Sequence, residues 1–446
     1  MSYSVGTDSE VGYLRTVLVH RPGLELTRIT PRTRGRLRFD GMPWLARAQQ
    51  EHDALTDVLR ARGAEVIYVT ELLQDVFEYR AARNEAIAAA LAGADLGAVL
   101  GGIVRDHLES LGPKDLAAVL IAGLTPAELK SGSGLVYDLL DPHDFVIDPL
   151  PNMVFARDSS TWIGDQAVIG SLPGPRHREN ELMGVIYGHH PRFDGMRSCY
   201  AAGSSQLDGG DVLLLGPGVV AVGVGVRTTP ASAERLARHL LDTGVVHTVL
   251  AVPINQRGDG GHLDRACTVV GAGVVIMVPA LAFTLTALCI TVRADQLRVS
   301  RPRPFLEAAA EALGISSLTV IDTGVDPQQS GRGQWDDGGN ALALGPSVAV
   351  CNERSVETNA RLANAGFEVL TVPGSELGGI RGGPRGMCSP VRRDPAVVSD
   401  PAQATAESSR PTATPRPAAI LLDASPVPEP AGPAADSSRR ELTPMG

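Results

Sequence analysis

A histidine and a carboxylate stand two positions apart in this chain, at His262 and Asp264. Residues i and i+2 of a strand share a face, so both side chains could reach one pocket and act there as general acid and base. The same pair could equally form a structural hydrogen bond at the end of a strand. A metal site is disfavoured, because no further His or Cys stands at ligand spacing.

Three further clusters are weaker when each is taken alone. They are PNMVFARD at 151–158, DGGD at 208–211 and RGGPRGMCSP at 381–390. Two glycines between acids often form only a turn. The last cluster is a Gly-rich loop in which nearby cations and His262 could activate Cys388 as a nucleophile. It could also be a surface turn with an inert thiol.

One pattern recurs four times and connects these clusters. An acidic residue precedes a short apolar run, a turn containing glycine and a second apolar run, which is typical of a β-hairpin. The copies begin at Asp158, Asp208, Asp264 and Asp337. Repetition at roughly 50 to 70 residues indicates equivalent units around a common centre. The carboxylates would then gather in one central space, where they need a cationic partner.

Helices are expected to alternate with these hairpins. A strand is expected within 11–30 and another at 65–70. Residues 71–148, rich in Ala and Leu, predict an all-helical insertion, whereas the Pro/Ala/Ser-rich segment 396–446 predicts a disordered tail. Further helices are expected at 44–63, 232–244, 304–314 and 355–366. Strands and helices in this alternation indicate an α/β or α+β class.

The bulk composition argues against several function classes. The net charge of −10 disfavours a nucleic-acid or anionic-membrane partner, since both attract basic patches. The N-terminal residues contain no basic region followed by an apolar stretch, so a signal peptide is not expected. Residues 274–292 could mimic a membrane span, but Pro279 and three threonines favour a buried strand passing into a helix. Five scattered cysteines without CxxC spacing are typical of a cytoplasmic protein with reduced thiols.

From about Val11 to Pro395 the chain resembles arginine deiminase, a family of the guanidine-modifying (pentein) superfamily. The matching motifs include LVHRPG (18–23), FDGMPWLARAQQEHDAL (39–55), PNMVFARD (151–158), GGDVL (209–213), HLD (262–264), QWDDGGN (334–340) and GSELGGIRGGPR (374–385). The resemblance implies a five-bladed, pseudo-symmetric ββαβ fan over residues 1–395, with a helical insertion. It implies hydrolysis of L-arginine to L-citrulline and ammonia through an amidino-cysteine intermediate, without metal or cofactor. It also implies a homo-oligomer.

Residue by residue, the resemblance assigns the guanidinium end of the pocket. Asp158 and Asp264 match the guanidinium-binding aspartates, and His262 matches the general acid and base. Asp208 stands where the family has a glutamate, one methylene longer. A guanidinium is planar and rich in N–H donors, so carboxylates can bind it in a bidentate way.

The other implied contacts bind the far end of the substrate and line the pocket. Arg227 and Arg381 match arginines that hold the substrate carboxylate, which disfavours substrates without one, such as agmatine. Asn152 and Phe155 belong to the matched motif at 151–158 and are expected to line the pocket. Binding the substrate at both ends would position the reacting carbon.

The departures from the family pattern fall where covalent chemistry would occur. The family loop reads GPR followed by Cys-Met, whereas this chain has Gly386 at the nucleophile position and Cys388 two residues later. Two residues of extended chain span roughly 6.6 Å, far more than a nucleophile can be misplaced. Three interpretations remain open: a deiminase that uses Cys388 through a re-registered loop, a catalytically impaired arginine-binding relative, or a sequence that misrepresents a normal deiminase at 386–389.

Overall fold

The computed structural model describes residues 5–37, 39, 41–129, 132–141, 144–203, 205–254, 261–324, 339–378 and 382–396. The expectations for Arg381, for the hairpin copy that begins at Asp337 and for the tail beyond residue 396 fall outside these ranges, wholly or in part.

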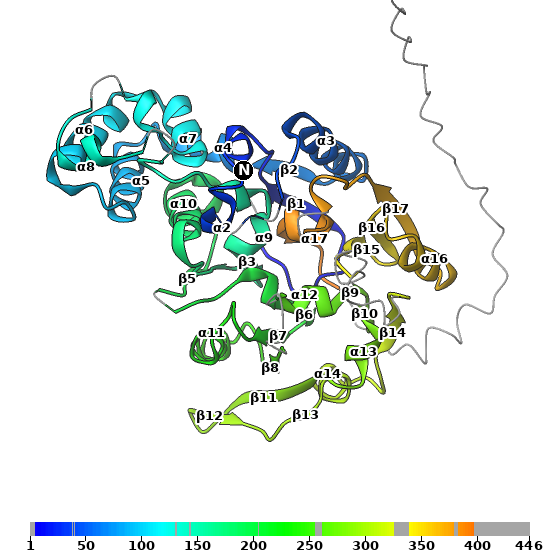
Figure 1. Ribbon diagram of the computed structural model, residues 1–446. Helices are drawn as coiled ribbons and strands as arrows, with labels where there is room; N and C mark the ends of the chain where they lie inside the picture. The colour runs from blue at the N-terminus through cyan, green and yellow to red at the C-terminus, as the bar shows by residue number, and fades with distance from the viewer. Residues whose placement is uncertain are drawn as a thin grey trace, which may run out of the picture.

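Within the described residues, five sheets repeat one arrangement around a centre (Figure 1). In each, two strands pair antiparallel and a third strand pairs parallel with the second. The strands, sheet by sheet, are β18 (Ser389–Arg393), β1 (Leu14–Val19) and β2 (Glu65–Tyr68); β3 (Ser160–Ile163), β4 (Gln166–Ile169) and β5 (Ser198–Ala201); β6 (Val212–Gly216), β7 (Val219–Val224) and β8 (Thr248–Pro253); β9 (Cys267–Gly271), β10 (Val274–Met277) and β14 (Thr319–Asp322); and β15 (Leu342–Gly345), β16 (Val348–Asn352) and β17 (Glu368–Val372).

One helix in each unit precedes the third strand and completes a ββαβ unit. In the same order, these helices are α3 (Leu45–Ala61), α10 (His177–His189), α11 (Pro230–Asp242), α14 (Phe305–Leu313) and α16 (Val356–Asn364). The expectation of a five-bladed ββαβ fan is therefore confirmed. The third sheet is extended by β11 (Thr286–Arg293), which pairs with β8, and by β12 (Gln296–Val299) and β13 (Arg303–Pro304).

The first unit is built from both ends of the fold. Strand β18 pairs antiparallel with β1, in a register that sets Ser389 opposite Leu18. Because β1 also pairs in parallel with β2, the C-terminal strand completes a sheet that the N-terminal strand begins. The segment just before β18 is thereby fixed at the centre of the fan.

A group of helices follows β2 and lies to one side of the fan (Figure 1). Its members are α4 (Val69–Val76), α5 (Arg80–Ala92), α6 (Gly97–Ser110), α7 (Pro113–Ala122), η1 (Pro126–Glu128) and α8 (Leu135–Leu139). Their buried leucines and alanines share one hydrophobic cluster with Trp162 of β3 and Met183 of α10. The helical group therefore packs mainly on the second unit.

The acidic residues of the repeat lie just before the strands rather than on them. Asp158 lies in α9 (Ala156–Ser159), Asp208 precedes η5 (Gly209–Asp211), and Asp264 lies in α12 (Leu263–Ala266). Each of these single turns leads directly into the first strand of its sheet. His262 and Asp264 therefore do not share a strand face, and the expectation that they do was wrong. The chain makes a helical turn before β9 begins, with His262 at the N-cap position.

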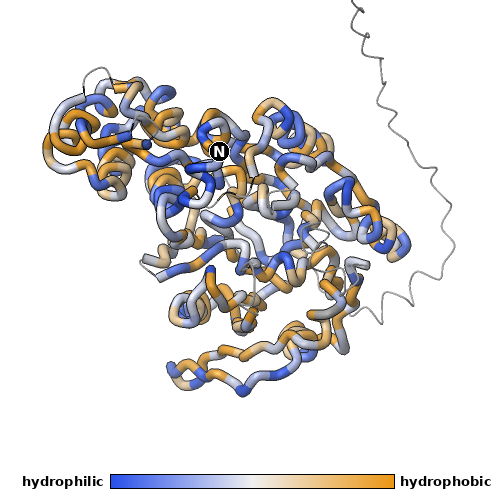
Figure 2. Tube along the Cα trace, in the orientation of Figure 1, coloured by the Kyte–Doolittle hydropathy of each residue, from blue (hydrophilic) through white to orange (hydrophobic). Residues whose placement is uncertain are grey.

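Buried hydrophobic residues of the described chain form five clusters distributed over the molecule. Figure 2 shows hydrophobic segments in the helical group and throughout the fan. The apolar run at 274–292 forms β10, the short helix α13 (Pro279–Ala282) and then β11, so the expected strand and helix are followed by another strand. Within the described ranges, no helix has the length and apolar content needed to cross a membrane.

Candidate active site

Short turns from different units meet at the centre of the fan. α9 contacts both η5 and α17 (Pro384–Met387), and α12 contacts η5. The two glycines of the DGGD motif permit this close approach. A Cβ atom on Gly209 would overlap the carbonyl oxygen of Arg157, and one on Gly210 would overlap the imidazole of His262. The Gly–Gly pair is therefore required by packing against the site.

The imidazole of His262 is surrounded by carboxylates. Its Nε2 atom lies 3.1 Å from Oδ2 of Asp208. Its Nδ1 atom lies 3.8 Å from Oδ1 of Asp158 and 3.7 Å from Oδ1 of Asp264. Burial and the charge of Arg227 act to lower the pKa of His262, but Asp208 and Asp158 outweigh them and raise it to about 9. The ring is therefore charged at neutral pH and can serve as a general acid.

Asp158 is held by an arginine from η3 (Gly174–Arg176). Nη2 of Arg176 donates to Oδ2 of Asp158 at 3.0 Å, and the same guanidinium binds the buried Glu179. Burial and the negative charge of Asp208 raise the pKa of Asp158 to about 6, against the opposing effects of His262 and Arg176. The carboxylate is therefore ionised at neutral pH but becomes protonated in mild acid.

Asp208 joins the histidine to an arginine at the edge of the site. Nη1 of Arg227 lies 3.4 Å from Oδ2 of Asp208, and the Arg227 side chain is 30 % exposed. Burial acts to raise the pKa of Asp208, but the positive charges of His262 and Arg227 outweigh it and hold that pKa well below its usual range. Asp208 is thus a permanently charged partner for His262.

Asp264 keeps one carboxylate oxygen available for a ligand. Its Oδ2 accepts hydrogen bonds from Nδ2 of Asn340 at 3.1 Å and from Nη1 of Arg385 at 2.8 Å. Its Oδ1 is buried and accepts no hydrogen bond from the described residues. A buried acceptor without a donor is costly, so this atom is suited to a ligand that brings an N–H group.

A buried ionic cluster supports Asp264 from behind. Glu10 accepts from Nη2 of Arg385 at 2.8 Å and from the guanidinium of Arg157 at 3.3 Å. Burial acts to raise the pKa of Glu10, but Arg157, Arg385 and Arg393 together lower it to about 2. Arg385 therefore links the N-terminal segment to the site while it stays fixed between two carboxylates.

Gly386, the residue at the family's nucleophile position, lies in α17 beside this cluster. Its backbone N–H donates to Oδ1 of Asn340 at 3.0 Å. A Cβ atom at residue 386 would lie 3.8 Å from Cδ1 of Phe155 and 3.9 Å from Oδ1 of Asn340, which are ordinary contact distances. The position therefore has room for a Cβ atom, whose nearest neighbours would be Phe155 and the Asn340 amide that binds Asp264.

Cys388 lies in the hydrophobic core at the start of β18. Its side chain is completely buried among residues such as Val17 and Leu342, and burial raises the pKa of its thiol to about 12. Nε of Arg157 donates to its carbonyl oxygen at 3.0 Å, and β18 begins at the next residue. A shift in the register of β18 would break the hydrogen bond from Arg157 and the pairing of β18 with β1. Cys388 as the nucleophile stays a prediction, and the structure does not place it with the His262 group.

The remaining expected site residues have varied surroundings. Phe155 borders Gly386 and is almost completely buried. Asn152 is also buried, but its Nδ2 donates to the carbonyl oxygen of Leu37 at 2.9 Å, so its amide nitrogen holds the N-terminal segment. Among the described residues, the structure therefore brings Asp158, Asp208, His262 and Asp264 together, with Arg227 at the edge. Arg381 lies outside the described residues.

Five residues that hold the site together were not predicted from the sequence. They are Glu10, Arg176, Glu179, Asn340 and Arg385. Asn340 and Arg385 occur within the quoted family motifs, so their positions could have been noticed. The other three belong to no motif or repeat, and only the fold brings them to the centre.

The donor set would also suit a metal ion in its spacing. Asp158, Asp208 and His262 each place one ligand atom within 4.8 Å of the others. A metal ion binds an imidazole in its neutral form, so it would have to displace the proton that the surrounding carboxylates stabilise on His262. The carboxylates can instead accept hydrogen bonds from an organic cation without deprotonating the histidine.

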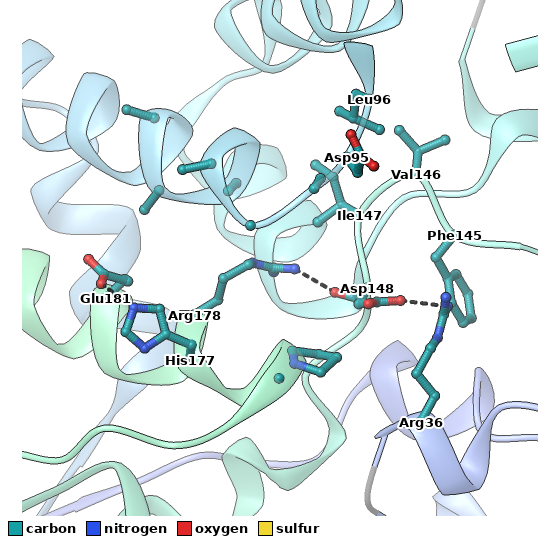
Figure 3. Close-up of a pocket in the computed structure, with 18 of the residues that line it drawn as sticks. Arg36, Asp95, Leu96, Phe145, Val146, Ile147, Asp148, His177, Arg178 and Glu181 are labelled. Atoms are coloured by element: carbon teal, nitrogen blue, oxygen red, sulfur yellow. Dashed lines mark hydrogen bonds and ion pairs between the residues drawn. The ribbon is translucent and has the colours of Figure 1, made fainter. Parts of the chain in front are cut away.

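A separate cavity of about 840 Å³ lies between the helical group and α10 (Figure 3). Arg36 and Arg178 approach Asp148 from opposite sides, as Figure 3 shows. Arg36 pairs with the Asp148 carboxylate at 2.6 Å, and Arg178 donates to its carbonyl oxygen at 2.6 Å. Side chains of both charges, among them Glu85, Asp95 and Glu181, also line the cavity, so it presents no charge pattern that identifies a ligand.

Comparison with known proteins gives consistent results. The sequence model of the family described as arginine deiminase matches residues 35–393. The arginine deiminase of Rhodococcus erythropolis strain PR4 is 50% identical over 399 residues, which cover 88% of this chain and 98% of the relative. That of Mycobacterium marinum is 52% identical over 396 residues, with the same coverage of both chains.

Solved structures support the fold at much lower identity. The amidinotransferase SxtG from Microseira wollei matches with a TM-score of 0.53 and 13% identity, over 89% of this chain and 99% of that one. DDAH from Pseudomonas aeruginosa, a mutant complexed with citrulline, matches with a TM-score of 0.50 and 13% identity, over 84% and 99%. With half of the sequence identical over nearly the whole length of the relatives, this chain belongs to the arginine deiminase family.

Proposed function

We propose that this chain is an arginine deiminase that binds L-arginine at the centre of the fan and hydrolyses it to L-citrulline and ammonia. The observation that carries this proposal is the buried Oδ1 of Asp264, which accepts no hydrogen bond from the described residues and faces His262 at 3.7 Å. A guanidinium would donate one edge to Asp264 and another to Asp158, and so satisfy both carboxylates. No metal or cofactor is needed for this step.

The proposed reaction converts arginine and water into citrulline and ammonia. In this proposal the thiolate of Cys388 attacks the guanidinium carbon, and ammonia leaves as the amidino-cysteine forms. Water then attacks this intermediate and releases citrulline and the thiol. His262 is charged at neutral pH, so it can donate a proton to the departing ammonia and then accept one from water.

The far end of the substrate is assigned to arginines. Arg227 borders the site through Asp208 and would bind the substrate carboxylate, together with Arg381. A carboxylate held at one end and a guanidinium held at the other would fix the reacting carbon. Membership of the family and the scattered cysteines support a cytoplasmic homo-oligomer.

Arginine binding is expected to weaken as the pH falls through about 6. Burial and Asp208 raise the pKa of Asp158 to about 6, and only the ionised carboxylate accepts two guanidinium hydrogen bonds. Because its pKa is raised, the charge is complete well above pH 6, and the dissociation constant should rise about tenfold per pH unit below it. Calorimetric titration with L-arginine between pH 5 and 8 measures this. A constant affinity would contradict it, and Asp158→Asn should remove the dependence.

A second candidate function is arginine binding without turnover. Two observations favour it: residue 386 is a glycine, and the thiol of Cys388 lies in the core with a pKa near 12. A thiol with that pKa is almost entirely protonated at neutral pH. Turnover through Cys388 would therefore be slow. A citrulline assay combined with an arginine titration separates the two candidates. Formation of citrulline supports the deiminase, whereas arginine binding without citrulline supports the binding protein.

Under the first function, Cys388→Ala is expected to abolish citrulline formation. Cys267→Ala is the matched control, because Cys267 is also completely buried at the start of a first strand, and burial raises the pKa of its thiol to about 12. Initial rates at saturating arginine measure the effect. If the alanine variant of Cys388 forms citrulline as fast as the control, Cys388 is not the nucleophile.

A further inference from the structure

We propose that Asp211 and Thr228 are positioning residues that fix His262 relative to Asp208 and Arg227 for arginine binding. The inference rests on the proposed function, because it concerns the same pocket. It adds two residues whose roles do not depend on direct contact with the substrate.

The two side chains form a continuous hydrogen-bonded path. The hydroxyl of Thr228 donates to Oδ2 of Asp211 at 2.6 Å. Oδ1 of Asp211 accepts from the backbone N–H of Leu263 at 2.9 Å. The backbone N–H of Asp208 in turn donates to Oγ1 of Thr228 at 3.1 Å. Asp211 and Thr228 are both completely buried, so water does not compete for these bonds.

The path begins next to His262, passes next to Arg227 and ends at Asp208. Leu263 follows His262 in the chain, and Thr228 follows Arg227. One carboxylate and one hydroxyl therefore connect three segments that lie apart in the sequence. These same segments supply the 3.1 Å approach of His262 to Asp208 and the 3.4 Å approach of Arg227 to Asp208.

The charge on His262 depends on these distances. Asp208 and Asp158 raise the pKa of the imidazole, while burial and Arg227 oppose them. Asp264 also faces the ring at 3.7 Å. If the path between the segments is cut, Asp208 can move away from His262. Asp158 and Asp264, the carboxylates proposed to bind the guanidinium, then no longer keep the spacing that it needs.

Thr228→Val tests the path, because valine has nearly the same shape and no hydroxyl. We expect the dissociation constant for L-arginine to rise about tenfold, with a lowered His262 pKa in histidine-labelled NMR titrations. Thr228→Ser keeps the hydroxyl, so its dissociation constant for L-arginine and its His262 pKa should match those of the unaltered chain. Thr358→Val is the matched control, because its buried hydroxyl donates to the carbonyl of Thr323 on another unit. It should lose stability while it keeps arginine affinity and the His262 pKa.

The outcomes separate this inference from the proposed function. If the unaltered chain fails to bind arginine, the proposed function fails. If it binds, and folded Thr228→Val keeps the affinity and the His262 pKa, the positioning role is wrong. Should Thr228→Val not fold, Asp211→Asn replaces it as the test, because an amide oxygen can accept only one of the two bonds. It should weaken binding in the same direction, and unchanged affinity with an unchanged His262 pKa would overturn the inference.

Discussion

Gly386→Cys is expected to raise citrulline formation by at least about 100-fold over the unaltered chain. A nucleophile misplaced by about 1 Å can lose a factor of that size, and Cys388 lies two residues from the family position. Gly386 has helical backbone within α17, and a Cβ there meets Phe155 and Asn340 only at ordinary contact distances. The Cβ atom of the new cysteine therefore fits without a clash, near the Asn340 amide that binds Asp264.

The rate of citrulline formation at saturating arginine measures this effect, and mass spectrometry of the quenched protein identifies the modified cysteine. Gly386→Ala is the control, because it fills the same space without a thiol. It should bind arginine and form no more citrulline than the unaltered chain. If Gly386→Cys folds and binds arginine but gains no activity, the attacking residue lies elsewhere.

Glu10→Gln is expected to lower the free energy of unfolding by about 3–5 kcal/mol. Glu10 is the buried carboxylate between Arg157 and Arg385, and removal of one partner leaves uncompensated buried charge. The lowered pKa of Glu10, about 2, means that its contribution is complete above pH 4.5 and is lost as the pH falls toward 2. The variant should lose this part of the acid dependence.

Denaturant unfolding at neutral pH and at several acid pH values measures both effects. Glu85→Gln is a suitable control, since Glu85 is 54 % exposed in its pair with His189 and should contribute little. A loss below about 1 kcal/mol for Glu10→Gln would mean that the central arginines are compensated in another way.

Much of the fold could be predicted because its signals are local. The four helices expected from apolar spacing correspond to α3, α11, α14 and α16, with ends within two residues. The glycine-containing turns between apolar runs predicted the hairpins, and the recurrence of these hairpins predicted the repeated unit. The single helical turns before the first strands were not predicted, because four residues are too short for a helical period. That error put His262 and Asp264 on a strand.

The site could be predicted only in part. Asp158, Asp208 and His262 could be recognised because each stands in a motif just before the first strand of a repeated unit. The link between Glu10 and Arg385 spans 375 residues and has no local pattern, so it follows only from the pairing of β18 with β1. The burial of Cys388 depends in the same way on where α17 ends and β18 begins.

The most direct test of the central claim is a crystal structure of the unaltered protein with bound L-arginine. We expect a guanidinium that donates to Asp158 and to Oδ1 of Asp264, the buried oxygen that accepts no hydrogen bond from the described residues. An arginine bound away from both aspartates would show that the proposed pocket is wrong.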